Sequence, residues 1–278
     1  MNLMTKFSNG WTIAANSFKV LKENRQLLIF PVLSGVSIIV IVASFCVTFL
    51  GFSGWELDAI SEPGRMVSYA ILFFFYITNY FVIVFFNMAL VHCTSLYFKG
   101  EEVTVQKGIE FSKGRIGSIL GWAVFAGLVG GILKIIQENA GSLGKIITGL
   151  VGIVWSIATF FVVPVIAYEN LGPIAAFKKS AMLMKQKWGE SLAANFSLGL
   201  IQFILMIGVG GLLFLLGSII HPLAGIVLAI TGVFVVIAII SATQTIFVSA
   251  VYHNINNDPV SHFNQQMIDD LFQEKRRD

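Results

Sequence analysis

The sequence predicts an all-α, polytopic membrane protein whose six transmembrane helices form three hairpins, each preceded by a cytoplasmic amphipathic helix in the membrane interface. Composition gives the membrane class: 56% of the 278 residues are apolar and only 12% are charged, whereas a soluble domain typically has about twice that charged fraction. Six stretches are also long and apolar enough to cross a hydrocarbon core, which takes about 20 helical residues. Cationic residues gather on alternate connections between these stretches, which indicates the orientation.

The six expected spans cover most of the chain. They are Leu27–Leu50, Met66–Leu96, Ile116–Ile136, Ile146–Tyr168, Leu192–Ile220 and Leu223–Val251. The second is long and aromatic, so we expect it to tilt or to run past the bilayer. The third contains two small-xxx-small pairs, Gly117 with Gly121 and Gly127 with Gly131, a spacing that lets neighbouring helices approach closely.

The distribution of cations predicts which side of the membrane each connection occupies. Fifteen of the 18 lysines and arginines lie before the first span, between the second and third, between the fourth and fifth, or after the sixth. The other side has only Arg65, Lys134 and Lys145. Because cytoplasmic loops carry an excess of Lys and Arg, we expect both termini in the cytoplasm and the protein in the bacterial cytoplasmic (inner) membrane. Orientation thus explains the basic residues, and no nucleic-acid partner is expected.

Each basic segment repeats one pattern, in which apolar residues recur at helical spacing and lysines or arginines stand off that stripe. We therefore expect a single membrane domain with a parallel internal repeat. Its units are an interfacial helix plus a hairpin in residues 1–98, 99–170 and 171–254, followed by a cytoplasmic tail helix in residues 255–278. Basic amphipathic helices of this kind lie in the head-group plane. The expected lipid contacts are Trp11, Lys178, Lys179, Lys185, Lys187 and Trp188.

Pro164 interrupts the fourth span and is the first candidate functional residue. Proline has no N–H to donate and clashes with the carbonyl group four residues earlier, here that of Phe160, so the helix should kink or unwind. A backbone group freed in hydrocarbon must find another partner. We therefore expect the break to face protein or a wet cavity rather than lipid.

Glu169 follows at the end of the same span, before the Gly172-Pro173 turn that starts the next helix. As a functional group it could bind a cation, a proton or a basic substrate head group. Alternatively, it caps the helix that begins at Pro173 or pairs with Lys178 or Lys179, since anions near helix N-termini are ordinarily stabilising. We favour the second interpretation.

Polar side chains within the spans complete the candidate set. Asn79 and Asn87 lie in the second span, and they could line a polar path or form hydrogen bonds between helices. The second role is the commoner one for intramembrane amides. Together with Pro164, Glu169 and Ser180, they mark either a substrate path or a structural signature.

Several kinds of chemistry are disfavoured by the sequence. No Asp, Lys or Arg lies in the middle of a span, which argues against an ion-coupled pump. The four histidines lack the spacing of a metal site, and no hydrolase or metalloprotease motif occurs. Cys46 and Cys93 both fall within spans, so no disulfide is expected. We expect neither an enzyme nor a cofactor.

Motifs spread over nearly the whole chain carry a family resemblance. They are Trp11, Ser17 and Leu21; Leu28-Ile29-Phe30-Pro31; Phe86-Asn87-Met88-Ala89-Leu90; Gly121-Trp122; Trp155; Phe160-Phe161-Val162-Val163-Pro164; and Glu169, Gly172-Pro173, Ala176, Ser180 and Trp188-Gly189. Together they resemble an uncharacterised family of bacterial and archaeal six-span integral membrane proteins, a domain of unknown function. The run from Pro164 to Ser180 is more remotely similar to the membrane domain of some glycerophosphodiester phosphodiesterases. The resemblance implies a topology but no activity. His92-Cys93 depart from the family pattern, because typical relatives have Gly or Ala at these positions.

Three functions are compatible with these observations. The first is a transporter or permease-like protein for a small or lipid-like substrate, which repeated hairpins with a broken helix favour. The second is a non-enzymatic scaffold or assembly partner that binds lipid and other proteins. The third, suggested only by the remote resemblance, is a membrane domain serving phospholipid head-group metabolism. Expected partners are membrane lipids, and also other membrane proteins or a second copy of the chain.

Overall fold

The computed structural model describes residues 15–52, 65–139, 141–187 and 192–256. These residues form helices joined by short connections, with no strand among them, which confirms the all-helical class. Five helices in these ranges are long and apolar enough to cross a membrane. The chain is therefore a multi-pass membrane protein. The sixth expected span has a described apolar part of only Gln202–Ser218, so six spans in three hairpins stay a prediction.

The elements follow in the expected order, with the fourth span divided in two. After a helical stretch at residues 15–23, they are η1 (Arg25–Leu28), α2 (Ile29–Phe52), α3 (Arg65–Phe98), α4 (Val105–Lys113), α5 (Ile116–Asn139), α6 (Gly141–Ala158), α7 (Val162–Glu169), α8 (Pro173–Lys187), α9 (Leu192–Ser218) and α10 (Pro222–Ile255). Local chemistry sets several of these bounds. Thr104 caps α4, because its side chain accepts a hydrogen bond from the Lys107 N–H. His221 caps α10, whose first residue is proline.

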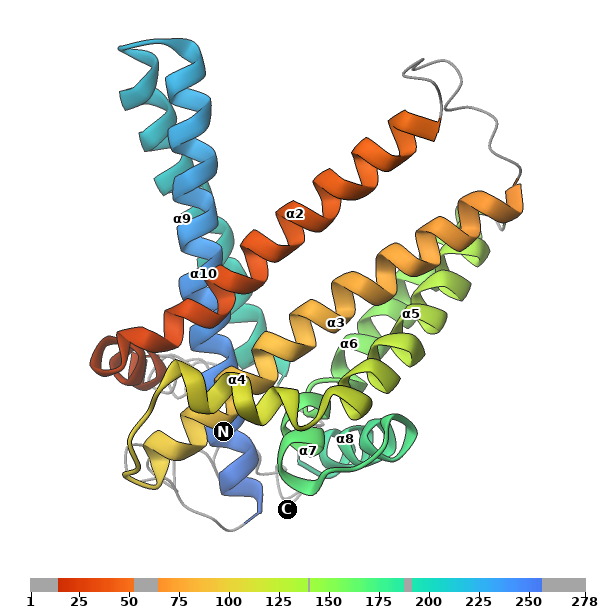
Figure 1. Cartoon of the computed structure of the whole chain (residues 1–278), viewed down its shortest axis with the longest axis vertical. Helices are drawn as coiled ribbons and strands as arrows, with labels where there is room; N and C mark the ends of the chain where they lie inside the picture. The colour runs from red at the N-terminus through yellow and green to blue at the C-terminus, as the bar shows by residue number, and fades with distance from the viewer. Residues whose placement is uncertain (1–14, 53–64, 140, 188–191, 257–278) are drawn as a thin grey trace, which may run out of the picture.

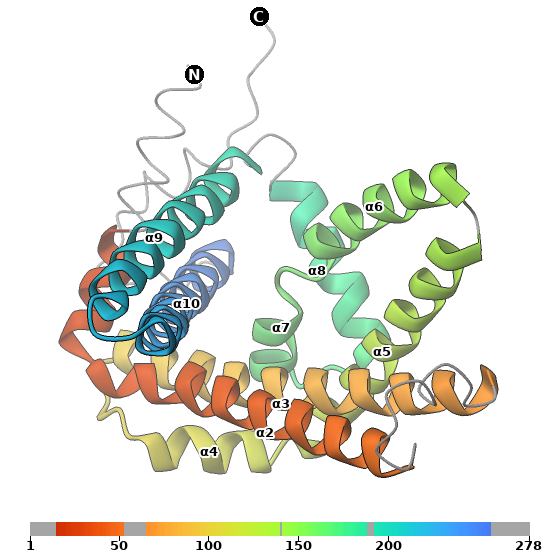
Figure 2. The ribbon, with the colours of Figure 1, turned by 90° about the horizontal axis from the view of Figure 1, so that it is seen from above.

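Two arms of long helices diverge from a common base (Figure 1). Helices α9 and α10 pack along each other as one arm, and α2, α3, α5 and α6 extend in another direction as the second arm. Seen from above, α7 and α8 lie between the α9–α10 arm and the α5–α6 pair (Figure 2). We use "base" for residues 15–23, η1, α4, the turn before α7, α7, α8 and the adjoining ends of α2, α3, α5 and α10.

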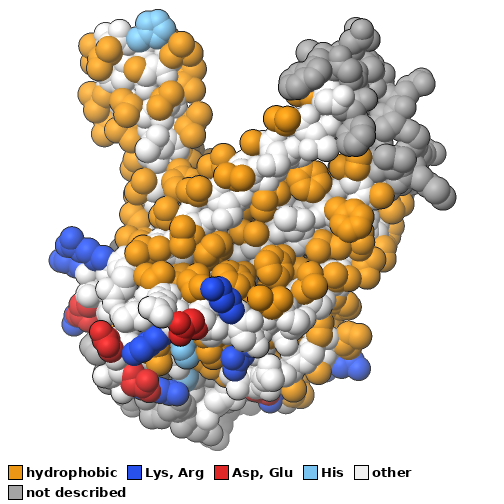
Figure 3. All heavy atoms as spheres, in the orientation of Figure 1, with side chains coloured by type: hydrophobic (Ala, Val, Ile, Leu, Met, Phe, Trp, Pro, Cys, Tyr) orange, Lys and Arg blue, Asp and Glu red, His pale blue; other side chains and the backbone are white. Residues whose placement is uncertain are grey.

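The packed core lies in the base, whereas the arms are mostly exposed. Its largest fully buried side chains are Phe30, Phe161, Phe247, Leu27, Met88, Leu90, Ile119, Ile166 and Ile246. By contrast, Val40 on α2 is 58% exposed and Leu215 on α9 is 65% exposed. Figure 3 shows apolar side chains covering both arms and charged side chains gathered at the base. This division suits arms that stand in hydrocarbon, where exposed apolar side chains meet lipid tails.

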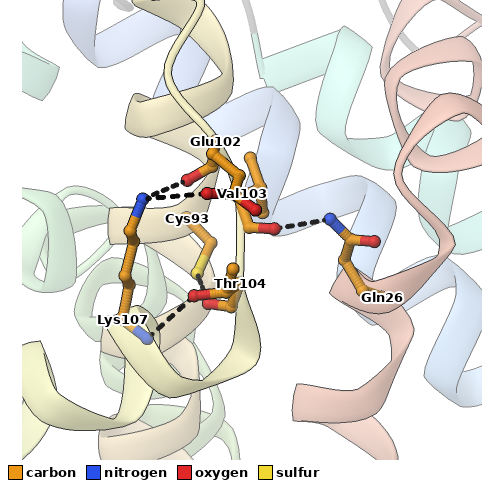
Figure 4. A network of polar contacts seen from close by, with 6 residues as sticks. All are labelled: Gln26, Cys93, Glu102, Val103, Thr104 and Lys107. Atoms are coloured by element: carbon orange, nitrogen blue, oxygen red, sulfur yellow. Dashed lines mark hydrogen bonds and ion pairs between the residues drawn. The ribbon is translucent and has the colours of Figure 1, made fainter.

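A polar network fixes the connection between α3 and α4 to η1 (Figure 4). The Gln26 side chain donates to the Val103 carbonyl over 2.8 Å, and the Lys107 ammonium donates to the Glu102 carbonyl over 2.9 Å. The Cys93 thiol donates to the carbonyl of Thr104. Helix α4 is thereby held against the rest of the base.

Helix α4 itself packs closely on α3. The hydroxyl of Ser112, which is fully buried, donates to the Phe85 carbonyl over 2.9 Å. Gly108 faces the same surface, where an added Cβ would lie 2.8 Å from the Cys93 sulfur. The neighbouring His92 ring stacks on Phe111 of α4 with a centroid distance of 3.8 Å. His92-Cys93 thus form part of the α3–α4 contact.

Candidate functional site

The helix breaks immediately before Pro164, as its sequence predicts. Helix α6 ends at Ala158, three residues form a turn, and α7 begins at Val162. Pro164 is the third residue of α7 and is buried. The first four N–H groups of a helix have no acceptor within it, so a proline there removes no intrahelical hydrogen bond. The break therefore converts a costly mid-helix proline into a tolerated one.

Ser180 of α8 satisfies the backbone at this break. Phe161, the residue that caps α7, donates its N–H to the Ser180 hydroxyl oxygen over 3.0 Å, and neither residue is exposed. A buried N–H without a partner would be destabilising, and the Phe161 side chain cannot cap a helix. Ser180 supplies the acceptor for this N–H from a neighbouring helix. The structure thus brings Pro164 and Ser180 into one feature that faces protein, not lipid.

Glu169 ends α7 and connects it to two other helices. One carboxylate oxygen accepts a hydrogen bond from the Tyr252 hydroxyl of α10, and the other lies 3.4 Å from the Lys179 ammonium of α8. This ion pair confirms the interpretation of Glu169 as a partner of a lysine on the next helix. Asn170 follows with φ of +50°, a left-handed conformation that asparagine adopts more readily than most residues.

Tyr168 adds a second connection between α7 and the long helices. Its hydroxyl lies 3.0 Å from the Val91 carbonyl of α3, to which it donates, and 2.9 Å from the Ser249 hydroxyl of α10. The Tyr168 and Tyr252 rings also stack, 5.4 Å apart. We define the α7 latch as these contacting residues: Phe161, Tyr168, Glu169, Lys179, Ser180, Ser249 and Tyr252. The latch ties α7 to α3, α8 and α10, and so to both arms.

The remaining predicted site residues are not part of the latch. The Asn87 side-chain oxygen accepts a hydrogen bond from Thr245 of α10 over 3.3 Å, which is the helix-to-helix role we favoured for intramembrane amides. The Asn79 amide donates to the Phe75 carbonyl within its own helix. The five candidates therefore do not form a single site: three gather at α7, and two lie along α3.

Of the expected lipid contacts, the structure describes those in α8. Lys178 and Lys185 are exposed, whereas Lys179 is partly buried beside Glu169. Lys187 ends α8, but its side chain lies outside the described residues, as do Trp11 and Trp188. The interfacial position of α8 stays a prediction.

An aromatic cluster attaches α8 to the second arm. Phe177 stacks on Trp155 of α6 with a centroid distance of 5.3 Å, and Trp155 stacks on Trp122 of α5 at 6.0 Å. Beside them Gly121 lies close to Pro173, whose ring carbon would be 3.0 Å from an added Cβ. Motif residues far apart in the sequence thus meet at one junction of α5, α6 and α8.

Two cavities lie in the second arm, one between α3, α5 and α6 and the other between α3 and α5. The polar one, of about 390 Å³, is lined by Tyr76, Tyr80, Lys134, Gln137, Lys145 and Thr148 among others. The apolar one, of about 290 Å³, includes Phe73, Leu128, Gly131, Ile132 and Ile135. Tyr76 and Lys134 belong to both. Neither cavity is lined by a residue of the α7 latch, so neither is the expected polar path to Pro164 and Glu169.

Sequence reasoning did not identify the latch tyrosines or these cavities. One signal was present, because a tyrosine hydroxyl at the end of an apolar span needs a hydrogen-bond partner, as at Tyr168 and Tyr252. Within the described residues, no group of three or more His, Cys, Asp and Glu side chains could hold a metal ion.

Comparison with known proteins places the chain in a family without assigning an activity. No curated protein and no solved structure matches it. The remote likeness to phosphodiesterase membrane domains stays a prediction. One family model, described as a family of unknown function (DUF6159), matches residues 66–262. That range is more than half of the chain and takes in the α7 latch, the aromatic cluster and both cavities. The chain belongs to this family of unknown function, DUF6159.

Proposed function

We propose that this protein is a permease-like membrane protein, and not an enzyme, that moves a lipid-like substrate between the two leaflets. The observation that carries the proposal is the divergence of two apolar arms from one hydrogen-bonded base. Figure 3 shows a notch between the α9–α10 arm and α2, with apolar side chains along its borders. We call this notch the wedge. It would open sideways to the bilayer, the route by which a lipid-like substrate would arrive.

The chemistry of the borders favours an acyl chain over a polar solute. On α2, Ile39 is 59% exposed, and on α10, Val227 and Ile230 are 62% and 64% exposed. Lipid tails are as apolar as these side chains, so an acyl chain can move between bilayer and wedge with little change in solvation. A polar solute would lose its hydration there. The wedge narrows where α2 crosses α10, with Gly35 against the Phe234 ring.

In this proposal the α7 latch is a hinge and not a substrate path. Its hydroxyl and carboxylate groups already have protein partners, which supports a mechanical role over ion binding. The turn before α7 interrupts the backbone hydrogen bonds between α6 and α7, so these two helices can tilt relative to each other. Closure about short connections of this kind is a common way for domains to move.

We infer that the base faces the cytoplasm, with both termini on that side. Fifteen of the 18 cations fall in the segments that this orientation makes cytoplasmic, and the positive-inside rule favours it. Membrane lipids are then the expected partners at the base and along the arms.

Lipid translocation in vesicles tests the proposed function. The purified protein is reconstituted in liposomes containing a trace of fluorescent phospholipid, and an impermeant reductant then quenches the outer leaflet. We expect the inner-leaflet fluorescence to disappear faster than in protein-free liposomes. Equal rates would overturn the proposal.

The variant Glu169→Gln separates the hinge from a direct role of the carboxylate. Glutamine keeps an oxygen acceptor for Tyr252 and removes only a partly exposed ion pair, which is worth about 0–1 kcal/mol. We therefore expect the variant to translocate lipid as the wild type does. Loss of translocation in a variant that unfolds at the wild-type temperature would place the carboxylate on the substrate path instead.

A scaffold role is the second candidate, and the exposed lysines of α8 favour it. Lys178 and Lys185 of α8 are exposed, and they could attract an acidic partner protein. If so, purification in a mild detergent should yield a stoichiometric partner, and Lys178→Glu with Lys185→Glu should release it. The head-group metabolism hypothesis rests on the remote resemblance alone.

A further inference from the structure

The corner between α4 and α5 carries two cations that have no counter-charge within the described residues. Lys113 ends α4, and Arg115 directly precedes α5. Neither side chain forms an ion pair with an acidic residue that the structure describes, not even with Glu110 one turn earlier on α4. Lys107, on the same helix, differs, because its ammonium lies 4.0 Å from the Glu102 carboxylate. The corner therefore presents positive charge that its own neighbours do not balance.

Arg115 is held by a stack of rings and not by a polar contact. The Cζ atom of its guanidinium lies 3.7 Å from the centroid of the Phe111 ring. The His92 ring stacks on the same Phe111 ring at 3.8 Å, with an interplanar angle of 6°. Two groups this close to one centroid cannot share a face, so Phe111 lies between the imidazole and the guanidinium. Arginine commonly stacks on aromatic faces, and here the stack orders the guanidinium before any anion arrives.

The guanidinium has lost hydration without gaining a polar partner. Its Nε atom is buried and has no hydrogen-bond partner among the described residues, and the side chain as a whole is half-buried. Burial lowers the pKa of Arg115, because the charged form is the one that loses solvation. An anion at the terminal N–H groups would restore the lost interactions. Phosphate oxygens match these groups in a bidentate geometry.

The position of the corner favours a phospholipid over a soluble anion. An apolar helix long enough to cross a membrane begins at Ile116, directly after Arg115. Ile116 and Leu120 are 44% and 46% exposed, and they lie one turn apart on one face of α5. Figure 3 shows Lys and Arg side chains on the face that carries α4, bordering apolar side chains of the second arm. A cation at such a border meets head groups, and the apolar side chains beyond it meet acyl chains.

We propose that this corner, defined as Lys113, Arg115 and the stacked rings of Phe111 and His92, binds the phosphate of an anionic phospholipid in the leaflet on the side of the base. Arg115 donates to the phosphate oxygens, and Lys113 adds a second positive charge. One acyl chain lies along the exposed apolar face of α5. Two unbalanced cations favour a head group with net negative charge over a zwitterionic one. The inference does not rest on the proposed function, because the corner can hold a lipid whether or not the protein translocates lipid.

Native mass spectrometry of the purified full-length protein in mild detergent tests the head-group preference. The protein is titrated with phosphatidylglycerol or with phosphatidylcholine of the same chain length. We expect one phosphatidylglycerol to be retained in preference to phosphatidylcholine. Arg115→Gln should weaken that preference roughly fivefold, the contribution of one cation beside an anionic lipid, and Lys113→Gln should weaken it in the same direction.

Lys107→Gln is the matched control, because it removes one cation from the same helix and changes the net charge equally. Lys107 already lies beside Glu102, so its removal should leave the preference unchanged. Equal weakening by Arg115→Gln and Lys107→Gln would indicate a general effect of surface charge and would overturn the proposal. So would the absence of any preference in the wild type.

Two further variants separate the stack from the charge and keep the proposal testable if Arg115→Gln unfolds. Arg115→Lys keeps the positive charge but loses the planar group that binds phosphate through two N–H donors, so we expect a smaller loss than with glutamine. Phe111→Leu keeps both cations and removes the aromatic face, and it should weaken the preference about two- to fivefold. An unchanged preference in Phe111→Leu would overturn the role of the stack in positioning the guanidinium.

Competition identifies the source of the phosphate. Retention of phosphatidylglycerol in millimolar inorganic phosphate supports a lipid site, whereas its complete displacement would identify a free-anion site and overturn the lipid proposal. Selective lipid binding without translocation in liposomes would keep this inference and overturn the proposed function. Translocation without head-group preference would do the reverse.

Discussion

The Ser180 hydroxyl is the single group whose removal should damage the α7 latch most. Ser180→Ala leaves the buried N–H of Phe161 without an acceptor, and an unsatisfied buried donor costs about 1–3 kcal/mol. We therefore expect a clear drop in the thermal unfolding midpoint in detergent. Ser44→Ala is the control, because Ser44 is exposed and its hydroxyl bonds only to its own helix at Val40, so its effect should stay within about 0.5 kcal/mol. Equal midpoints for the two variants would contradict the role of Ser180 as the acceptor for this N–H.

At this scale the sequence predicts what short-range chemistry determines. The break before Pro164 follows from the missing N–H of proline, and the pairing of Glu169 with Lys179 follows from opposite charges ten positions apart. Ser180 was singled out only through the family resemblance, which could not show its partner. Tyr252 escaped notice because its partner Glu169 is 83 positions away, and no periodicity in a single sequence encodes such a pairing.

The contact between α9 and α10 gives the sharpest prediction at the scale of elements. A Cβ added at Gly217 would lie 2.7 Å from the Cα and N atoms of Gly225. Backbone atoms cannot move aside unless the helices separate, so Gly217→Ala should destabilise the arm by about 1–3 kcal/mol, as overpacking does. Gly208→Ala is the matched control on α9, since an added Cβ there meets nothing within 4 Å. Alanine favours a helix by up to about 1 kcal/mol over glycine, so the control should be neutral or stabilising.

Limited proteolysis and thermal unfolding of both variants measure this difference. Opposite signs for the two substitutions would identify Gly217 as the point of closest approach. The same sign and size would mean that α9 and α10 can separate at this point without loss, and the arm would then not be a rigid unit.

The positions of the long apolar helices could be predicted from the sequence. Which helix packs against which was harder to predict. Of the small-xxx-small glycines in α5, Gly121 meets Pro173 and Gly127 meets Ile77, whereas Gly117 and Gly131 face open space. A glycine spacing shows that close approach is possible on one face, but it does not show which neighbour arrives there. The Gly217 contact was not predicted, because it is set by the short turn between α9 and α10 and not by a repeated glycine spacing.

At the scale of the whole molecule, the arrangement of the two arms is the feature that the sequence could predict least. Composition predicts the membrane class, because so few charged residues leave the long helices no other environment. The divergence of the arms has no such signal, since apolar side chains that face lipid and those that face another helix are alike in a hydropathy pattern. The base differs because its tyrosines, serines and charged residues need specific partners. For that reason the candidate residues near Pro164 could be found and the wedge could not.

Cysteine labelling in intact cells tests the proposed orientation of the base. In a Cys46→Ala, Cys93→Ala background, Lys145→Cys and Lys185→Cys each carry one thiol at a position that is exposed in the structure. Lysines and arginines concentrate on the side of Lys185, which the positive-inside rule assigns to the cytoplasm. A membrane-impermeant maleimide should therefore label the thiol at position 145 in intact cells and the thiol at position 185 only after permeabilisation. The reverse pattern would put the base outside the cell and would overturn the proposed orientation.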